Sequence, residues 1–98
     1  MTVFYEKGGA QVFADFTDHD GAYSDPASVK LKWVDPNGVA SERTYGSGGT
    51  PPIVKASTGR YTCDIPIGTK YGTWRFFWYA EDQVSLYGEF DVVSIDFI

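Results

Sequence analysis

Alternation of apolar and polar residues is the clearest pattern in the chain, and it predicts β-strands. Between positions 28 and 34, Val29, Leu31 and Trp33 occupy every second place, with Lys30 and Lys32 between them. A side-chain period of two places the apolar residues on one face of a strand and the lysines on the other. This segment therefore predicts a half-buried antiparallel strand.

Further short segments resemble strands in the same way, and turn residues separate them. They cover residues 10–16, 40–45, 53–56, 61–65 and 74–79, and a last segment carries Phe90 and Val92. The chain holds 11 Gly and 5 Pro, so few intervals are long enough for a helix. Asp35-Pro36-Asn37-Gly38 is a strong turn signal, because proline fixes φ and Asn-Gly tolerates a positive φ. Together these features predict an all-β fold, a two-sheet antiparallel sandwich of about seven strands without a helix.

Strand parity also predicts which residues form the core. The inward positions are Val12, Phe16, Val29, Leu31, Trp33, Tyr61, Ile65, Trp74, Phe76, Trp78, Phe90 and Val92. Aromatic residues make up 17 % of the chain, and large rings suit a core that has few positions to fill. Tyr61 follows Gly59, which predicts the sandwich device in which a tyrosine hydroxyl binds backbone near a sheet corner.

Length, charge and cysteine content limit the classes of protein that fit. The 98 residues predict a single domain over 1–98, and one Cys excludes an internal disulfide. The net charge of -5 argues against binding nucleic acid or an anionic membrane, since both need clustered cations. No apolar stretch approaches the roughly 18 residues of a membrane-spanning helix, and the start of the chain lacks the features of a signal peptide.

A calcium loop is the first candidate site, at Asp18–Gly21. The loop signature requires an acid or amide where Phe16 stands and a glutamate where Ala27 stands. The match therefore fails at both ends, and a plain turn explains the segment. The sequence predicts no metal and no cofactor.

A Cys–His pair is the second candidate site. Cys63 lies on the inward side of its strand by alternation, where a thiol behaves as a small inert hydrophobe. No residue with an orienting role accompanies Cys63 and His19, and the 13 acidic residues show no spacing that singles out a pair. We therefore expect a protein that is not an enzyme.

An ordered set of turn and strand motifs resembles a known group of proteins. The motifs are Asp25-Pro26-x-x-Val29-x-Leu31, Asp35-Pro36-Asn37-Gly38, Ser57-Thr58-Gly59-x-Tyr61, Gly72-Thr73-Trp74-x-Phe76-x-Trp78 and Gly88-Glu89-Phe90-x-Val92. Over about residues 8 to 93, the chain is similar to small stand-alone immunoglobulin-like sandwich proteins encoded among the structural genes of tailed bacteriophages. The resemblance implies an immunoglobulin-like fold without a disulfide, and a virion-associated adhesive or decorating module. The chain departs from that group at Phe77 and Tyr79, where polar residues are usual, and in its extension over residues 94–98.

The outward face of the 74–79 strand is the predicted partner-binding surface. If Trp74 and Trp78 point inward, then Arg75, Phe77 and Tyr79 point outward. Aromatic residues with arginine, rimmed by charges, have the composition of a protein interface. Two alternatives stay open here: an aromatic platform for a sugar ring, and rings that only improve cross-strand packing.

The C-terminal extension is the second predicted contact. In residues 94–98, Ile95 and Phe97 alternate with Ser94, Asp96 and Ile98. An apolar end on an edge strand is an aggregation liability unless it pairs, and strand addition to another subunit would remove that liability. Ile95, Phe97 and Ile98 are therefore predicted contact residues, with extension of the chain's own last strand as the alternative.

The residue patterns predict a non-enzymatic protein with a binding surface, and the resemblance implies a structural protein of a bacteriophage virion. The expected role is capsid decoration or a head–tail associated module, made in the host cytoplasm and located in the virion. Its partners would be capsid, head–tail or tail subunits, with a homo-oligomer as a further possibility. The alternative is a carbohydrate-binding module that attaches particles to a cell envelope or mucus through Phe77, Tyr79 and loop aromatics.

Overall fold

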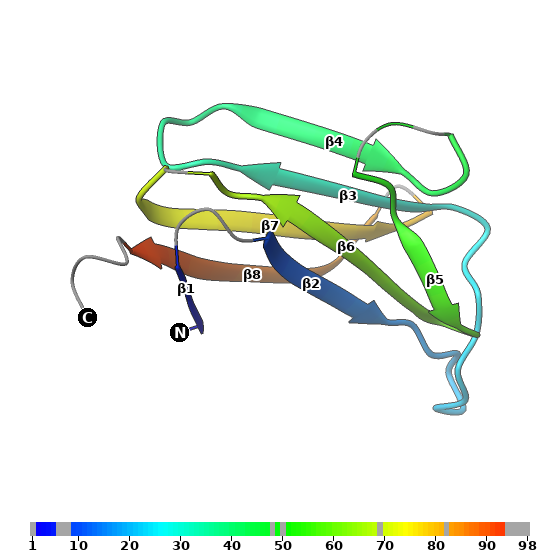
Figure 1. Ribbon diagram of the computed structural model, residues 1–98. Helices are drawn as coiled ribbons and strands as arrows, with labels where there is room; N and C mark the ends of the chain where they lie inside the picture. The colour runs from blue at the N-terminus through cyan, green and yellow to red at the C-terminus, as the bar shows by residue number, and fades with distance from the viewer. Residues whose placement is uncertain are drawn as a thin grey trace.

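Two β-sheets packed face to face form the described part of the chain (Figure 1). The computed structural model describes residues 2–5, 9–47, 49, 51–68, 70–81 and 83–93, with side chains from residue 10 onward. The strands are β1 (Thr2–Tyr5), β2 (Gly9–Asp15), β3 (Val29–Val34), β4 (Ala40–Thr44), β5 (Val54–Ser57), β6 (Arg60–Pro66), β7 (Gly72–Ala80) and β8 (Gln83–Val93). The larger sheet has the order β1-β8-β7-β3-β4, and the smaller sheet, in front in Figure 1, has the order β2-β6-β5.

The predicted two-sheet sandwich is confirmed, with seven strands in antiparallel pairings and no helix among the described residues. Two features of the larger sheet were not predicted. Strand β1 pairs parallel with β8, from Thr2 opposite Phe90 to Tyr5 opposite Val93. Strand β8 begins at Gln83, well before the predicted segment around Phe90.

The core lies between the sheets and contains almost all of the predicted inward residues. The buried hydrophobic residues are Ala10, Val12, Ala14, Phe16, Val29, Leu31, Trp33, Ile53, Tyr61, Cys63, Ile65, Ile67, Trp74, Trp78, Phe90 and Val92. Phe76 also points inward and packs against this core, but it is only partly buried. Its ring lines an open groove at the side of the sandwich.

Asp25 joins three separate segments at one end of the smaller sheet. Its Oδ1 accepts hydrogen bonds from the Gly59 backbone N–H at 2.7 Å and from the Tyr61 hydroxyl at 3.0 Å. Its Oδ2 accepts from Lys55 Nζ at 2.6 Å. The predicted partner of Tyr61 was therefore wrong: the hydroxyl binds a side-chain carboxylate and not the backbone, because Asp25 offers a charged acceptor at that corner.

Asp35 stabilises the turn between β3 and β4 from a buried position. The backbone carbonyl of Asp35 accepts from the Gly38 N–H at 3.0 Å, and Gly38 has a φ of 87°. The side chain of Asp35 also accepts from the backbone N–H groups of Asn37 and Val39 at 2.9 Å each. Lys70 Nζ lies 3.0 Å from the second carboxylate oxygen, so the buried charge is neutralised. The predicted turn is confirmed, and Gly38 is the residue that takes the positive φ.

Candidate partner-binding face

The outer face of the larger sheet brings the predicted β7 residues together with neighbours from β3 and β8. The three rows of the register are Val34–Arg75–Glu89, Lys32–Phe77–Tyr87 and Lys30–Tyr79–Val84. Residues directly opposite in an antiparallel pair point to the same side of the sheet. These nine residues are called the outer face below.

The outward orientation of Arg75, Phe77 and Tyr79 follows the predicted parity, but their exposure differs. The Arg75 side chain is 62 % exposed, whereas Phe77 and Tyr79 are half-buried. Phe77 packs against Tyr87, with ring centroids 5.0 Å apart and an angle of 50° between the rings. Cross-strand packing therefore covers part of the surface that parity alone assigned to solvent.

Val84 and Tyr87 supply the most exposed apolar surface of the outer face, and the alternation pattern of the sequence did not identify them. Their exposed fractions are 54 % and 49 %. They were missed because the predicted last strand began too late. The alternation of Val84 and Leu86 with Ser85 and Tyr87 was the available signal, but the bulge near Tyr79 shifts its register.

Charged groups on and around the outer face are arranged as pairs across neighbouring strands. Lys30 Nζ lies 3.5 Å from a carboxylate oxygen of Glu42 on β4, and Arg75 Nε lies 4.0 Å from Glu89. Exposed pairs of this kind contribute little to stability. The pKa of Tyr87 is raised, first by partial removal of its hydroxyl from water and then by the Glu89 carboxylate.

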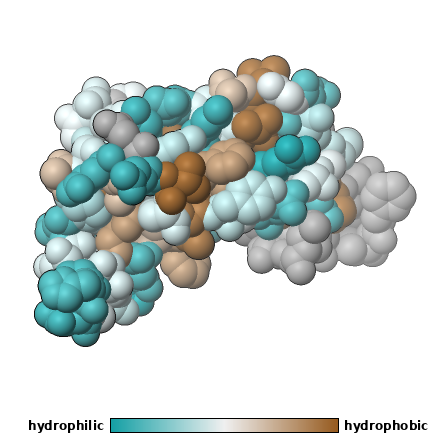
Figure 2. All heavy atoms as spheres, turned by 180° about the vertical axis from the view of Figure 1, so that it is seen from behind, coloured by the Kyte–Doolittle hydropathy of each residue, from teal (hydrophilic) through white to brown (hydrophobic). Residues whose placement is uncertain are grey.

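Figure 2 views the molecule from the side of the larger sheet. Apolar surface, in brown, is concentrated near the middle of this view, and hydrophilic surface borders it on several sides. An apolar centre with a polar rim is the usual arrangement of a protein interface.

The predicted contact residues of the C-terminal extension, Ile95, Phe97 and Ile98, lie outside the described residues. The described part of β8 shows what precedes them. Asp91 accepts a hydrogen bond from the Thr73 hydroxyl at 2.7 Å, and Val93 lies opposite Tyr5 of β1. The edge of β8 is therefore already paired where the extension begins.

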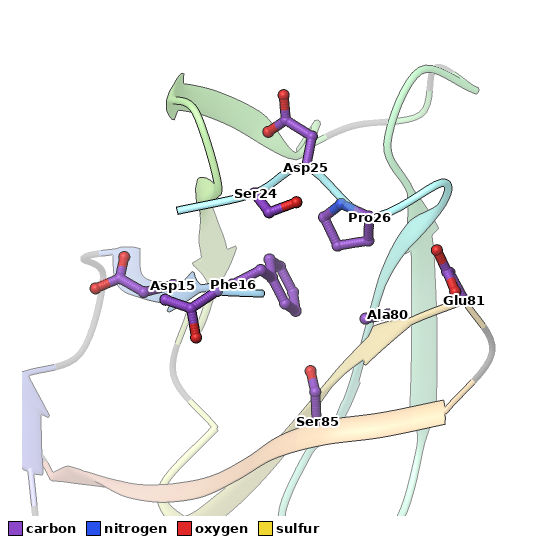
Figure 3. Close-up of a pocket in the computed structure, with 9 residues that line it drawn as sticks. Asp15, Phe16, Ser24, Asp25, Pro26, Ala80, Glu81 and Ser85 are labelled. Carbon is purple, nitrogen blue, oxygen red and sulfur yellow. The ribbon is translucent and has the colours of Figure 1, made fainter. Parts of the chain in front are cut away.

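A shallow hollow of about 450 Å³ lies between the segment around Asp25 and the β7–β8 hairpin (Figure 3). Phe16 and the Ser85 hydroxyl point toward its centre, whereas the Asp25 carboxylate points away from it. Glu81, at a φ of 53°, accepts a hydrogen bond from the Ala27 N–H at 3.1 Å. Asp15 is the third carboxylate that lines the hollow, and it pairs with Arg60. Each of the three carboxylates therefore holds a backbone N–H group or a side chain in place.

The structure also places the residues of the calcium-loop candidate and of the Cys–His candidate. Asp18 Oδ1 accepts from the backbone N–H groups of Asp20 and Ala22, which makes Asp18–Gly21 a capped turn. The described residues hold no group of three or more His, Cys, Asp or Glu that could hold a metal ion. Cys63 is buried, and burial raises its pKa to about 11, whereas the His19 side chain is 90 % exposed. Such a thiol is poorly suited to act as a nucleophile.

Comparisons with known proteins define the fold class. No family model and no curated protein matches the sequence. Solved structures similar to this chain include the ZIG-8–RIG-5 IG1–IG1 heterodimer (TM-score 0.53, 10 % identity, 94 % of this chain and 80 % of that one). The ZIG-8 IG1 homodimer is similar at a TM-score of 0.51 and 12 % identity over 95 % of this chain and 78 % of that one. The extracellular domain of the voltage-gated sodium channel β4 subunit is similar at a TM-score of 0.52 and 11 % identity, over 96 % of this chain and 90 % of that one.

These similarities establish an immunoglobulin-like β-sandwich without a disulfide, as predicted. Within the described residues, no helix is long and apolar enough to cross a membrane.

Proposed function

We propose that this chain is a non-enzymatic protein-binding module and that its outer face binds the partner. The observation that carries the proposal is the apolar centre formed by Phe77, Tyr79, Val84 and Tyr87, with charges at its rim. Aromatic residues and arginine are enriched in protein interfaces, and central aromatic anchors supply most of their binding energy. The similar structures are described as an IG1–IG1 heterodimer, an IG1 homodimer and parallel homodimers with a role in cell–cell adhesion, which supports a protein partner.

The partner that we propose is another virion subunit, of the capsid, the head–tail junction or the tail. The support for this placement is the resemblance of the sequence motifs to small phage immunoglobulin-like proteins. On a repeating lattice, many copies make weak individual contacts sufficient through avidity. An acidic, protein-binding module suits such a role.

The geometry of the aromatic residues favours a protein over a glycan. A sugar ring stacks best on a flat aromatic surface, whereas the Phe77 and Tyr87 rings meet at 50°. Phe77 and Tyr79 are also half-buried, so little of their ring faces is free to stack. An uneven apolar surface of this kind complements protein side chains.

Two tyrosines with the same exposed fraction allow a matched test. Tyr87 lies on the outer face, and Tyr23 lies in the loop beside Gly59, and each is 49 % exposed. Particles of the source phage carrying the wild-type chain, Tyr87→Ala or Tyr23→Ala would be purified, and the copy number per particle measured by quantitative mass spectrometry. We expect a fixed copy number for wild type and Tyr23→Ala and a loss of more than about tenfold for Tyr87→Ala.

Three outcomes would count against parts of the proposal. Absence of the wild-type chain from particles would reject the virion placement. Equal incorporation of both variants would reject the outer face as the contact. Unchanged incorporation together with loss of glycan-array binding in Tyr87→Ala would favour the carbohydrate alternative.

A further inference from the structure

An apolar groove runs along the side of the sandwich, between the edges of the two sheets. Strand β2 is the edge of the smaller sheet. Strand β8 has β1 beside it only from Phe90 onward, so Gln83–Glu89 has no described strand on that side. The groove between these edges has a volume of about 470 Å³ and is lined by Gln11, Val12, Phe13, Phe76, Leu86, Glu89 and Phe90. It is called the edge groove below.

The edge groove exposes apolar side chains, and its β8 edge lacks two of the residue types that commonly protect a free edge. Phe13 is 63 % exposed and Leu86 is 41 % exposed. Native edge strands commonly carry lysine or proline, which discourage pairing with another strand. The segment Gln83–Glu89 contains neither. Unpaired backbone groups beside an apolar slot form the type of site that binds an added strand.

The C-terminal residues of the same molecule cannot fill the groove. From Val93 to Leu86 there are seven strand steps, or about 23 Å. The five residues 94–98 extend at most about 18 Å, and reversing direction would use part of that length. In addition, β1 already covers the β8 edge from Phe90 to Val93. Residues 94–98 of the same molecule therefore cannot extend along the groove as far as Leu86.

We propose that the edge groove binds residues 94–98 of a second copy of this chain as an added β-strand. These residues read Ser-Ile-Asp-Phe-Ile, so Ile95 and Phe97 would point into the slot from alternate positions. Five residues fit within Gln83–Glu89, the seven-residue stretch of β8 that has no described strand beside it. This interaction uses a surface separate from the outer face and does not depend on the proposed function.

The proposed exchange predicts a dimer as the smallest closed assembly. Residues 94–98 follow the end of β8 in the sequence, and the acceptor edge is the first part of the same strand. If each copy places these residues in the groove of the other, both grooves are occupied and the assembly closes at two copies.

The first experiment measures self-association of the full chain by sedimentation velocity over a range of concentrations. We expect a concentration-dependent dimer for wild type and weakening of more than about tenfold for Phe97→Asp and for Leu86→Asp. Ser94→Ala, on the opposite parity of the tail, and Val39→Asp, at an exposed turn position distant in sequence from the groove, are the matched controls and should dimerise normally.

The second experiment guards against variants that simply misfold. A fluorescent peptide of residues 93–98 is titrated onto full-length Phe97→Asp, whose own tail is disabled and whose groove is intact. We expect saturable binding there and none to the double variant Leu86→Asp/Phe97→Asp, with the same thermal midpoint for both chains. A wild-type chain that stays monomeric, a dimer that persists in Phe97→Asp, or peptide binding that survives Leu86→Asp would each overturn the proposal.

Discussion

At the scale of single residues, Asp25 shows how one carboxylate organises the corner of the smaller sheet. It holds the Gly59 N–H, the Tyr61 hydroxyl and the Lys55 ammonium group at once. Gly59 is buried, with a φ of 73°, and a Cβ there would lie 2.5 Å from the Phe16 carbonyl oxygen. The corner therefore needs glycine at position 59 and an acceptor with two oxygens at position 25.

The first residue-scale prediction concerns the pH dependence of this corner. The hydrogen bond from Lys55, then those from Gly59 and Tyr61, keep the pKa of Asp25 below its ordinary value of 3.8. A lowered pKa stabilises the folded state above the unfolded-state pKa, and this contribution disappears as pH falls through the folded-state pKa. We expect Asp25→Ala to lower the free energy of unfolding at about pH 7 and to approach wild type at about pH 3 or below.

Urea unfolding of both chains across this pH range would check the prediction. Asp20→Ala is the control, because the Asp20 side chain is 77 % exposed in a loop. If the loss in free energy of unfolding in Asp25→Ala stays constant down to the lowest pH, the charge of Asp25 is not its cause. If that loss only equals the loss in Asp20→Ala, Asp25 has no special role at this corner.

At the scale of elements, the alternation of residues 28–34 was sufficient to predict β3, because one face is buried and the other is not. The same reasoning found most of the core and the outward orientation of Arg75. It missed the start of β8, because the bulge near Tyr79 shifts the period-two pattern by one residue. It also missed β1, whose parallel pairing depends on β8 and not on its own four residues.

Phe76 and Gly88 illustrate an element-scale contact that parity does not reveal. They lie opposite each other on β7 and β8, and the Phe76 ring lies across the glycine. A Cβ built on Gly88 would lie 2.2 Å from Phe76 Cζ. The absence of a side chain at position 88 thus lets Phe76 lie flat along the wall of the edge groove.

The second prediction follows from this contact. Gly88→Ala should lower the free energy of unfolding by about 1–3 kcal/mol, because the added methyl group displaces the Phe76 ring. In a Phe76→Leu background, Gly88→Ala should lower the free energy of unfolding by less, since the smaller leucine side chain leaves room for the methyl group at position 88. A double-mutant cycle by urea unfolding measures the difference, and a coupling energy near zero would show that the two positions are independent.

At the scale of the whole molecule, the sequence predicted the sandwich but not which of its surfaces lie open. The edge groove arises because the smaller sheet has only β2, β6 and β5, while β1 covers only the last part of β8. This difference in coverage is a property of the assembled fold, and no local pattern encodes it. The outer face, in contrast, follows from the parity of β7, once β8 supplies Val84 and Tyr87.

The net charge of -5 provides the last prediction. Two copies that associate carry the same charge, and the tail brings Asp96 toward a groove that contains Glu89. Salt screens such repulsion, with a Debye length that falls from about 30 Å at 0.01 M to about 10 Å at 0.1 M. We therefore expect dimerisation of the wild-type chain to strengthen as sodium chloride is raised over this range, and to strengthen less in Asp96→Asn. Sedimentation equilibrium at several salt concentrations measures both dissociation constants. Weaker association at higher salt would instead indicate that opposite charges, such as Arg75 and Glu89 of facing molecules, hold the copies together, and would direct attention from the edge groove to the outer face.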